Sequence, residues 1–323
     1  MPKLACAILD DYQGVAAGYA DWSRLGDAVD IDFRREPIAA DQLATELAGY
    51  DVIVAMRERT AFDAALLAKL PRLKLLVTTG MANASIDLDA ARSAGIVVCG
   101  TRGVVGPAAE LAWALLLALT RRIPEETTNF RAGGRQWQLG VGAGLQGKTL
   151  GVVGLGKLGE RMARYGTAFG MDVLGWTRID TAGRCARLGI APAASLDDLL
   201  SRADVVALQV TLNASTRGMI GARELGLMKP GAILVNTSRG PIVDEAALIA
   251  ALESGRLGGA ALDVYDQEPL PRDHPFRRLP NVVATPHLGY VTDETYRIFF
   301  ADAVEDVAAW LAGAPLRVLN ATP

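Results

Sequence analysis

The sequence predicts an α/β protein made of two Rossmann-like domains, each with a parallel sheet covered by helices. Short aliphatic or β-branched runs alternate with longer amphipathic segments, which is the pattern of strands joined by helical crossovers. At 323 residues the chain is longer than one ordinary domain. A glycine-rich turn from Gly154 to Gly159 stands between a buried run and a helical segment, as at the start of a Rossmann fold.

The first block of elements has about the size of a small α/β domain. We predict strands at residues 3–9, 51–55, 73–78 and 96–99, and helices at 40–48 and 88–93. An apolar helix is expected from Pro107 to about Arg122, because proline suits the first helical turn. Residues 131–147 are rich in glycine, so we predict a loop that leads into a second domain.

The second block begins sharply after that loop. Its strands are predicted at residues 149–153, 172–176, 205–210, 232–235, 259–262 and 282–284. Helices are expected from the glycine turn to residue 169, at 244–253, and over a long amphipathic segment at 294–311. If this last helix packs on the first block, the first domain is discontinuous in sequence.

The composition argues against several classes of protein. The net charge is −3 with both signs interspersed, which offers no electrostatic footprint for nucleic acid or an anionic membrane. Cys6, Cys99 and Cys185 lie far apart, so a disulfide framework or a zinc site is not expected and a reducing cytoplasm fits better. The N-terminus lacks the pattern of a signal peptide, and the apolar residues 108–119 are too few to span a bilayer. We therefore expect a soluble, cytoplasmic protein with no metal, nucleic-acid or membrane partner.

Three glycines in the turn have the spacing of a dinucleotide-binding loop. Gly154 would allow the tight turn, Gly156 would let the backbone approach a pyrophosphate, and Gly159 would let helix and strand pack closely. The helix N-terminus would then offer free N–H groups and the positive end of its dipole to the phosphates. A merely structural turn is the alternative, but a strand before the turn and a helix after it favour nucleotide binding.

The end of the next predicted strand bears on the choice of cofactor. An acidic residue at this place would hold the ribose 2′-hydroxyl of NAD. Here the place is taken by Thr177, followed by Arg178. A hydroxyl and a guanidinium suit a 2′-phosphate, so NADP(H) is favoured over NAD(H). The alternative is that Arg178 is a solvated residue and that Asp180 supplies the carboxylate.

The chain contains two histidines. His274 stands in a polar stretch flanked by prolines, so we expect a surface loop. His287 follows the predicted strand 282–284, which places it at the carboxyl end of a parallel sheet, where ligands bind in open α/β folds. Histidine readily exchanges a proton near neutral pH, although a structural core histidine is an equal alternative for this residue alone.

Two further segments end predicted strands in the same way. Arg239 follows the strand 232–235 and offers a planar fork suited to a carboxylate. Glu268 follows the strand 259–262 and could lie against His287 and hold its proton. For each charged residue taken alone, a surface ion pair is the alternative.

Together these segments resemble the D-isomer-specific 2-hydroxyacid dehydrogenase family. The resemblance is carried by the glycine turn, the run Asn-Thr-Ser-Arg-Gly-Pro-Ile-Val-Asp-Glu from Asn236, the stretch from Asp263 to Pro269, and Thr-Pro-His-Leu-Gly from Thr285. It implies a cofactor domain of residues 104–290 inserted into a flavodoxin-like substrate domain of residues 1–103 and 291–323. It also implies a homodimer joined through the cofactor domain.

The resemblance further implies an NAD(P)-dependent oxidoreductase that interconverts a small 2-keto acid and a D-2-hydroxy acid by hydride transfer. Arg239 would bind the substrate carboxylate, His287 would donate the proton in reduction, and Glu268 would be its charged partner. The loop from Gly80 to Asn83, including Met81 and Ala82, would offer backbone N–H groups to the same carboxylate. The dinucleotide would be lined by Lys157, Leu158, Val210, Thr237 and Asp263, with Asp263 near the nicotinamide.

The sequence departs from the family at two places and leaves alternatives open. The family's His-x-Pro is Gln209-Val210-Thr211 here, and Thr177 replaces the common acidic residue. A dinucleotide-sensing corepressor of the same fold is one alternative. A formate dehydrogenase is another, although formate enzymes of the family carry an amide where Glu268 stands. The hydroxy acid itself, and whether Arg57 faces it, are not identified by the sequence.

Overall fold

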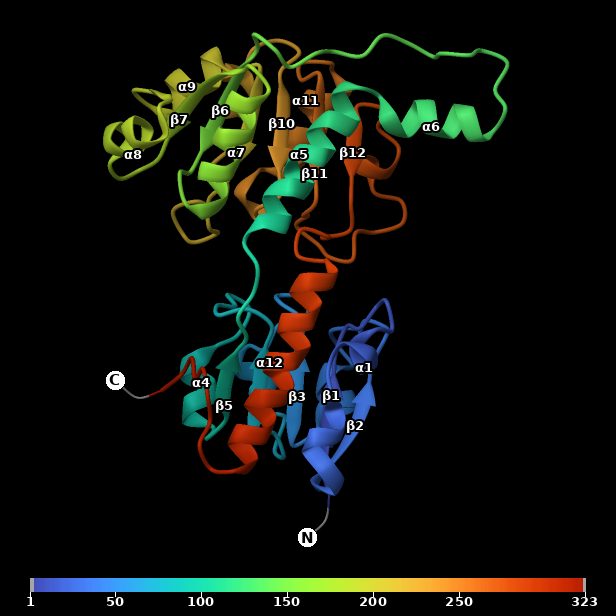
Figure 1. Cartoon of the computed structure of the whole chain (residues 1–323), viewed down its shortest axis with the longest axis vertical. Coiled ribbons are helices and arrows are strands. Elements are labelled where there is room, and N and C mark those ends of the chain that lie inside the picture. The colour runs from blue at the N-terminus through green and yellow to red at the C-terminus, as the bar shows by residue number, and fades with distance from the viewer. Residues whose placement is uncertain (1–2, 322–323) are drawn as a thin grey trace. The chain divides into compact units, whose positions relative to one another are not determined.

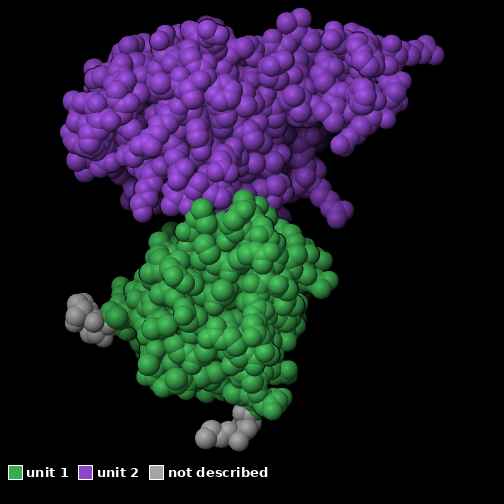
Figure 2. All heavy atoms as spheres, in the orientation of Figure 1, with its two compact units in different colours: residues 1–104, 291–323 green, residues 105–290 purple. Residues whose placement is uncertain are grey.

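The computed structural model describes residues 3–321. Contacts within the chain define two compact units: unit 1 runs up to residue 104 and resumes at 291, and unit 2 comprises residues 105–290 (Figure 2). Each unit has its own sheet, in which all paired strands are parallel. The α/β fold class predicted from the sequence is confirmed.

Unit 1 has five strands in the order β2-β1-β3-β4-β5 (Figure 1). The order reverses between β1 and β3, and open α/β sheets bind ligands at the carboxyl ends of the strands at such a position. The strands are β1 (Leu4–Ile8), β2 (Val29–Phe33), β3 (Val52–Ala55), β4 (Leu75–Thr78) and β5 (Val97–Gly100). The helices are α1 (Ala16–Tyr19), the 3-10 helix η1 (Trp22–Ala28), α2 (Leu43–Leu47), α3 (Ala64–Leu67), α4 (Leu88–Ser93) and α12 (Asp293–Leu311).

Burial explains why these segments form a sheet. Every residue of β3 and β4 is buried, as in parallel strands covered on both faces. The long helix α12 starts at the N-cap Thr292 and buries Phe299, Phe300 and Val304, and it packs on β4, η1 and α1. The C-terminal helix therefore belongs to the N-terminal unit, and unit 1 is discontinuous in sequence.

Unit 2 has seven strands in the order β12-β11-β10-β9-β6-β7-β8. The order reverses between β6 and β9, the position at which open α/β sheets bind dinucleotides. The strands are β6 (Thr149–Val153), β7 (Asp172–Trp176), β8 (Ala191–Pro192), β9 (Val205–Leu208), β10 (Ile233–Asn236), β11 (Gly259–Leu262) and β12 (Val282–Ala284). The helices are α5 (Gly106–Thr120), α6 (Ile123–Arg131), α7 (Lys157–Ala168), α8 (Thr181–Leu188), α9 (Leu196–Arg202), α10 (Ala222–Leu227) and α11 (Glu245–Glu253), with 3-10 helices η2 (Gly240–Ile242) and η3 (Pro275–Arg277).

The helix expected from Pro107 to about Arg122 is present as α5, and the main difference in this unit is a further helix, α6, that was not predicted. The helix α5 ends at Thr120, and a second helix, α6, starts at Ile123. Between them Arg122 adopts a left-handed backbone conformation, with φ of 56°, which stops α5. Pro124 lies in the first turn of α6, where its missing N–H needs no partner. Among residues 3–321, no helix is both long enough and apolar enough to cross a membrane.

Candidate active site

Three neighbouring strands of unit 2 carry the chemistry at their carboxyl ends. β10, β11 and β12 are adjacent in the sheet. Arg239 follows β10, Glu268 lies in the loop after β11, and His287 lies in the loop after β12. Because parallel strands end at the same edge, residues far apart in sequence are brought to one edge of unit 2.

His287 and Glu268 form a close pair. The Nδ1 atom of His287 is 2.6 Å from Oε2 of Glu268, and both side chains are largely buried. The second carboxylate oxygen of Glu268 accepts a hydrogen bond of 3.0 Å from the backbone N–H of Tyr265. The carboxylate is therefore fixed in place, and it holds the imidazole by Nδ1, so that Nε2 is the nitrogen left to exchange a proton.

Asp263 holds the loop that carries His287. Its buried carboxylate accepts hydrogen bonds from the Thr285 hydroxyl (2.6 Å) and from the backbone N–H groups of Leu288 (2.7 Å) and Gly289 (2.8 Å). Burial raises the pKa of Asp263, and these bonds together with nearby His287 act in the opposite direction. His287 itself has a φ of 55°, so its backbone needs this support on both sides.

Arg239 is half-buried directly before the 3-10 helix η2. Its Nη1 donates a hydrogen bond of 2.6 Å to the carbonyl of Ser238. The next residue, Gly240, packs against the loop after β11, because a Cβ at this position would overlap the backbone of Tyr265. A side chain at residue 240 would push the loops of Arg239 and Glu268 apart.

The glycine turn has the geometry of a dinucleotide-binding loop. Gly154 has a φ of 94°, and a Cβ there would overlap the carbonyl oxygen of Gln209, the residue directly after the neighbouring strand β9. A Cβ at Gly159 would overlap the carbonyl oxygen of Gly154. Gly156 is the N-cap of α7, has open space on its Cβ side, and leaves the first turn without a side-chain cap. This helix end fits a pyrophosphate, which its free N–H groups would bind.

Comparison with known proteins decides the family. The family profile described as D-isomer specific 2-hydroxyacid dehydrogenase, NAD binding domain, matches residues 113–289. The glyoxylate reductase of Aeropyrum pernix is 40% identical over 268 residues, which are 80% of this chain and 79% of that protein. The chain belongs to the D-isomer specific 2-hydroxyacid dehydrogenase family.

Two further relatives of this dehydrogenase extend the comparison. The D-3-phosphoglycerate dehydrogenase of Mycobacterium tuberculosis strain H37Rv is 38% identical over 90% of this chain, which spans only 54% of that protein's length. The crystal structure of a phosphoglycerate oxidoreductase from Vibrio cholerae has a TM-score of 0.90 and 37% identity, over 96% of this chain and all of that one. These findings support a nicotinamide-dependent oxidoreductase and do not favour the corepressor or formate dehydrogenase alternatives.

The adenosine end of the cofactor would lie after β7. Thr177 accepts, through its backbone carbonyl, a hydrogen bond of 2.6 Å from the Thr181 hydroxyl. The guanidinium of Arg178 donates to the Ser215 hydroxyl on the loop after β9. Asp180 is the N-cap of α8, where its carboxylate accepts from the N–H of Gly183 at 3.1 Å. The carboxylate that could serve an NAD ribose is thus engaged in a helix cap.

In unit 1, the loop after β4 is held in place by hydrogen bonds to neighbouring residues. The N–H of Gly80 donates to the buried Thr101 hydroxyl at 2.8 Å, so it is not free for a ligand. The side-chain amide of Asn83 donates to the carbonyl of Arg57 (2.6 Å) and to the Thr78 hydroxyl (2.9 Å). The expectation that the segment from Gly80 to Asn83 offers backbone N–H groups to a ligand therefore does not hold for Gly80, and it stays a prediction for Met81, Ala82 and Asn83. Of these three residues, Met81 and Ala82 are exposed.

Arg57 lies over the same loop. Its Nη1 donates to the carbonyl of Thr79 at 3.3 Å, and a Cβ at Gly80 would overlap this guanidinium. Gly80 has a φ of 95°, a backbone conformation that favours glycine, whereas the Arg57 side chain could move away from a Cβ. The Arg57 side chain is thus directed along its own loop in unit 1.

His274 differs from its expected surface position. It is half-buried, and its Nε2 lies 3.0 Å from Oε1 of Glu245 at the start of α11. Its Nδ1 accepts from the N–H of Phe276, which caps η3. The flanking prolines favour a loop, but the imidazole is used as a cap and an ion-pair partner.

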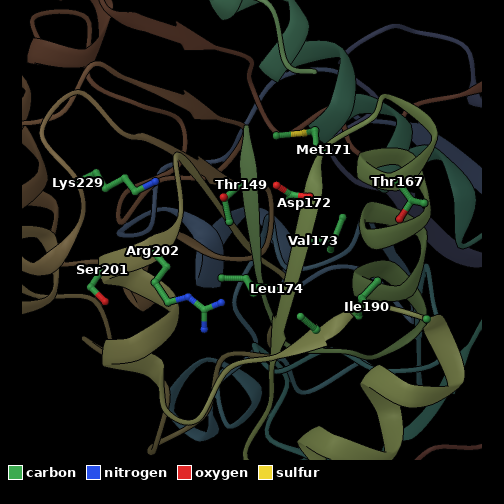
Figure 3. Close-up of a pocket in the computed structure, with 12 residues that line it drawn as sticks. Thr149, Thr167, Met171, Asp172, Val173, Leu174, Ile190, Ser201, Arg202 and Lys229 are labelled. Carbon is green, nitrogen blue, oxygen red and sulfur yellow. The ribbon is translucent and has the colours of Figure 1, made fainter. Parts of the chain in front are cut away.

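A surface hollow at the opposite edge of the unit 2 sheet is not part of this site. It has a volume of about 680 Å³ and lies against Thr149 and Asp172, the first residues of β6 and β7 (Figure 3). Its two cations are already paired, Arg202 with Asp198 at 3.0 Å and Lys229 with Asp204 at 2.9 Å. Among residues 3–321, no group of three His, Cys, Asp or Glu side chains could hold a metal ion.

Proposed function

We propose that this dehydrogenase interconverts a small 2-keto acid and the corresponding D-2-hydroxy acid with NADP(H). The observation that carries the proposal is the pair of His287 and Glu268 at the carboxyl edge of a dinucleotide-binding sheet. A bound reduced nicotinamide supplies the hydride to the carbonyl carbon. His287 supplies the proton to the carbonyl oxygen from Nε2, and Glu268 stabilises the imidazolium that this requires.

The other residues bind and orient the substrate. Arg239 would bind the carboxylate and draw electron density from the neighbouring carbonyl, because its planar fork makes paired hydrogen bonds. The backbone N–H groups of Met81 and Ala82 would bind the same carboxylate. Asp263 would keep the loop of His287 in place, and it lies where the nicotinamide is expected.

The cofactor domain assigned to residues 104–290 would bind the dinucleotide along its carboxyl edge. The pyrophosphate would lie on the N-terminus of α7, against Gly154, Gly156 and Gly159. Lys157 and Leu158 would contribute the first N–H groups of the helix. Val210 and Thr237 would line the nicotinamide half. The domain made of residues 1–103 and 291–323 would bind the substrate.

The proposed substrate class is tested by turnover. NADPH and NADH oxidation would be measured with glyoxylate, hydroxypyruvate, pyruvate, a phosphorylated keto acid, and branched and aromatic keto acids. We expect turnover with at least one small keto acid. Arg239→Ala should lower kcat/KM about 100-fold while dinucleotide affinity stays unchanged, and Arg239→Lys should recover part of the loss. No turnover with any keto acid would overturn the proposed reaction.

The proposed preference for NADP(H) is supported by the residues after β7. Thr177 and Arg178 present a hydroxyl and a guanidinium, Arg184 reaches the carbonyl of Leu155 at 2.9 Å, and Asp180 is engaged as a helix cap. Thr177→Asp should shift the preference toward NADH, because a carboxylate bonds ribose hydroxyls and repels a 2′-phosphate. The check is kcat/KM for both cofactors, and equal or better use of NADH by the unaltered protein would contradict the preference.

We also propose a homodimer through the cofactor domain. α6 and the segment after it extend beyond the sheet of unit 2 (Figure 1) and expose Phe130 (70%), Trp137 (78%) and Val141 (96%). Glu126 orders this arm by accepting from the N–H of Leu139 at 2.9 Å. An ordered arm with exposed apolar side chains is typical of an interface.

The dimer is tested by light scattering of the purified protein. Trp137→Ser together with Phe130→Ser should shift the mass toward a monomer at low concentration. Leu316→Ser, an exposed apolar residue of unit 1, is the matched control and should leave the mass unchanged. A monomeric unaltered protein would contradict the proposal.

We further propose a cytoplasmic location, which the three free, buried cysteines support.

A further inference from the structure

The residues at the end of β5 connect the loop after β4 to two other parts of unit 1. Thr101 accepts the N–H of Gly80, the first residue of that loop, at 2.8 Å. Gly100 and Arg102, on either side of Thr101 in the chain, are bonded to the C-terminal segment and to the helix α12. What holds these three residues therefore also determines where the loop lies.

Asp302 on α12 holds Arg102 through three hydrogen bonds. Its carboxylate accepts from the backbone N–H of Arg102 at 2.7 Å and from the guanidinium at 3.0 Å (Nε) and 2.6 Å (Nη2). Burial raises the pKa of Asp302, but the bonds from Arg102 and the nearby charge of Arg317 outweigh burial and hold the pKa below its usual value. The carboxylate is therefore charged at neutral pH, and its paired bonds fix the direction of Arg102 as well as its distance.

The hydroxyl of Thr101 links this contact to the loop. It donates to the carbonyl of Arg102 at 3.0 Å and accepts from the N–H of Gly80 at 2.8 Å. A hydroxyl has one proton and two lone pairs, so fixing the direction of its proton also fixes where it can accept. The orientation of the Arg102 carbonyl therefore determines where the Gly80 N–H finds its acceptor.

Gly100 is held by the C-terminal segment of the chain. Its N–H donates to the carbonyl of Arg317 at 3.0 Å, and the N–H of Leu319 donates to the carbonyl of Val98 at 2.7 Å. A Cβ on Gly100 would lie 2.7 Å from the carbonyl oxygen of Gly80 and 3.2 Å from the Leu319 side chain. The loop and the C-terminal segment both pack on this glycine, so the segment supports the loop at a second point.

Arg317 joins the C-terminal segment to α12. Its Nη2 donates to the carbonyl of Asp302 at 2.9 Å, and its Nη1 lies 2.6 Å from Oε2 of Glu305. Arg317 has a φ of 49°, a left-handed backbone conformation that costs free energy and persists only where other contacts support it. Both supports of residues 100–102 therefore lead to the same turn of α12.

We propose that Asp302 and Arg317 are positioning residues for the substrate. They hold residues 100–102, and through these residues they hold the backbone N–H groups of Met81 and Ala82 in the geometry that binds a carboxylate. A loop that is already ordered loses less entropy when the substrate binds, so their contribution appears in substrate affinity rather than in proton transfer. The inference rests on the proposed function, because it needs a keto acid at this loop.

Asp302→Asn tests the inference through steady-state kinetics with a keto acid that the unaltered protein reduces. Asparagine keeps the shape of the side chain but loses the charge and one acceptor oxygen. KM should rise about 3- to 10-fold, with kcat within about twofold and the dinucleotide Kd unchanged, because the lost bonds orient the loop. Asp302→Asn combined with Thr101→Val should raise KM no further than the larger single effect, because both act on the same bond of Gly80.

Asp51 provides the matched control, because it is a buried carboxylate at the amino edge of the same sheet. It is 3% exposed, against 2% for Asp302, and it accepts from the backbone N–H of Ala5 at 3.1 Å and from Nη2 of Arg72 at 2.7 Å. Asp51→Asn and Asp302→Asn should both lower the Tm, since each weakens a buried ion pair. Only Asp302→Asn should raise KM, and an equal rise in both variants would mean that lost stability alone produces it.

Arg102→Met keeps the inference testable if Asp302→Asn does not fold. The Arg102 side chain is 69% exposed, so its replacement leaves the core intact, yet it removes two of the three bonds to Asp302. KM should again rise about 3-fold, and Arg102→Lys should recover part of the loss, because a single charge replaces the planar fork.

Hydrogen exchange of residues 79–83 in the free protein measures the loop without turnover. Exchange should be faster in Asp302→Asn and in Arg102→Met than in the unaltered protein, and unchanged in Asp51→Asn, because only the first two loosen the support of the loop.

Three outcomes would overturn the inference. Unchanged exchange and unchanged KM in both variants would show that Asp302 does not hold the loop. Faster exchange with unchanged KM would show that the loop is held but does not bind the keto acid. Additive effects of Asp302→Asn and Thr101→Val on KM would show that the two residues act separately. Failure of the proposed function is distinct, because it would appear in the unaltered protein as no turnover of any keto acid.

Discussion

The buried polar side chains at the carboxyl edges of the two sheets differ in whether they have hydrogen-bond partners. In unit 1, the loop after β4 is bonded to its neighbours through Asn83 and through Thr101, which accepts from Gly80. In unit 2, Gln209 and Thr237 are also buried, but the polar atoms of their side chains have no hydrogen-bond partner among residues 3–321. These polar side chains of the first edge are bonded within unit 1, whereas those of the second edge have hydrogen-bonding capacity left for a ligand.

This difference bears on how the two halves would contribute to catalysis. A loop fixed by its own hydrogen bonds presents backbone N–H groups in a set geometry, which lowers the cost of ordering them when substrate binds. An edge with unused groups gains hydrogen bonds only when the ligand is present, so binding the cofactor also stabilises the protein. Unit 1 would therefore supply positioning, and unit 2 would supply binding energy and proton transfer.

The largest effect should come from the proton-transfer pair of unit 2. His287→Asn should lower kcat about 10²- to 10⁴-fold, because the proton donor is lost. Glu268→Gln should have a smaller effect, and the double variant should be no worse than His287→Asn alone, since the carboxylate acts through the imidazole. The measurement is a double-mutant cycle on kcat, with dinucleotide Kd as a check on folding.

A second histidine–carboxylate pair in the same unit is the matched control for this cycle. Glu245 lies 3.0 Å from His274 but serves the start of α11 and the cap of η3. Glu245→Gln should leave kcat within about threefold of the unaltered protein, because it removes a pair that stands outside the proposed chemistry. Full additivity of His287→Asn and Glu268→Gln would show that the two residues act independently.

The bounds of a strand could be predicted from the sequence where burial determines its pattern of apolar residues. The bounds of β6, β7, β11 and β12 agree with the predicted strands, because these are compact apolar runs that end at glycine or polar residues. β2, Val29–Phe33, was not predicted. It is an edge strand in which Asp30 and Asp32 alternate with apolar residues, as is typical of a half-buried strand, and it was missed because the predicted strands were sought as continuous apolar runs.

For the candidate site, the sequence predicts which loops carry the residues but not which contacts these residues make. The ends of three strands indicate that Arg239, Glu268 and His287 share one edge, and the structure brings the last two to 2.6 Å. The bond between Gly80 and Thr101 depends on which strand lies beside β4, and sequence alone does not give this register. The unused groups of Gln209 likewise emerge only when all neighbours are in place.

A smaller effect should follow from disturbing the completed edge of unit 1. Thr101→Val removes the acceptor of the Gly80 N–H and should displace the loop of Met81 and Ala82. We expect KM for the keto acid to rise about 3- to 10-fold, with kcat less affected and dinucleotide Kd unchanged, because one hydrogen bond that positions the loop is lost.

The conservative variant separates positioning from general damage. Thr101→Ser keeps the hydroxyl and should restore most of the KM, whereas a loss caused by packing alone would persist in serine, which lacks the methyl group. If Thr101→Val bound the keto acid normally, the completed edge of unit 1 would have no role in substrate binding, and the contrast between the two edges would be structural only.

The smallest effect should come from the protonation of a buried carboxyl group in unit 1. Asp306 on α12 is fully buried; its Oδ1 is 2.9 Å from Arg317, and its Oδ2 has no hydrogen-bond partner among residues 3–321. Burial raises the pKa of Asp306 to about 7, and Asp302 and Glu305 act in the same direction while Arg317 opposes them.

A raised pKa in the folded state fixes the sign of the stability change. Below about pH 4 the carboxyl is protonated in both states, and its contribution to stability is fully present. As the pH rises toward 7, the unfolded chain has already lost this proton and the folded chain still holds it, so stability falls until both are ionised.

Asp306→Asn removes this titration, so its Tm relative to the unaltered protein should increase by a few degrees between pH 5 and pH 8. Thermal unfolding at several pH values measures the difference, and because Asp10, whose pKa burial also raises, is present in both proteins, its contribution cancels. A difference in Tm that stays constant across this range would mean that Asp306 is ionised in the folded protein, with Arg317 compensating its charge in full.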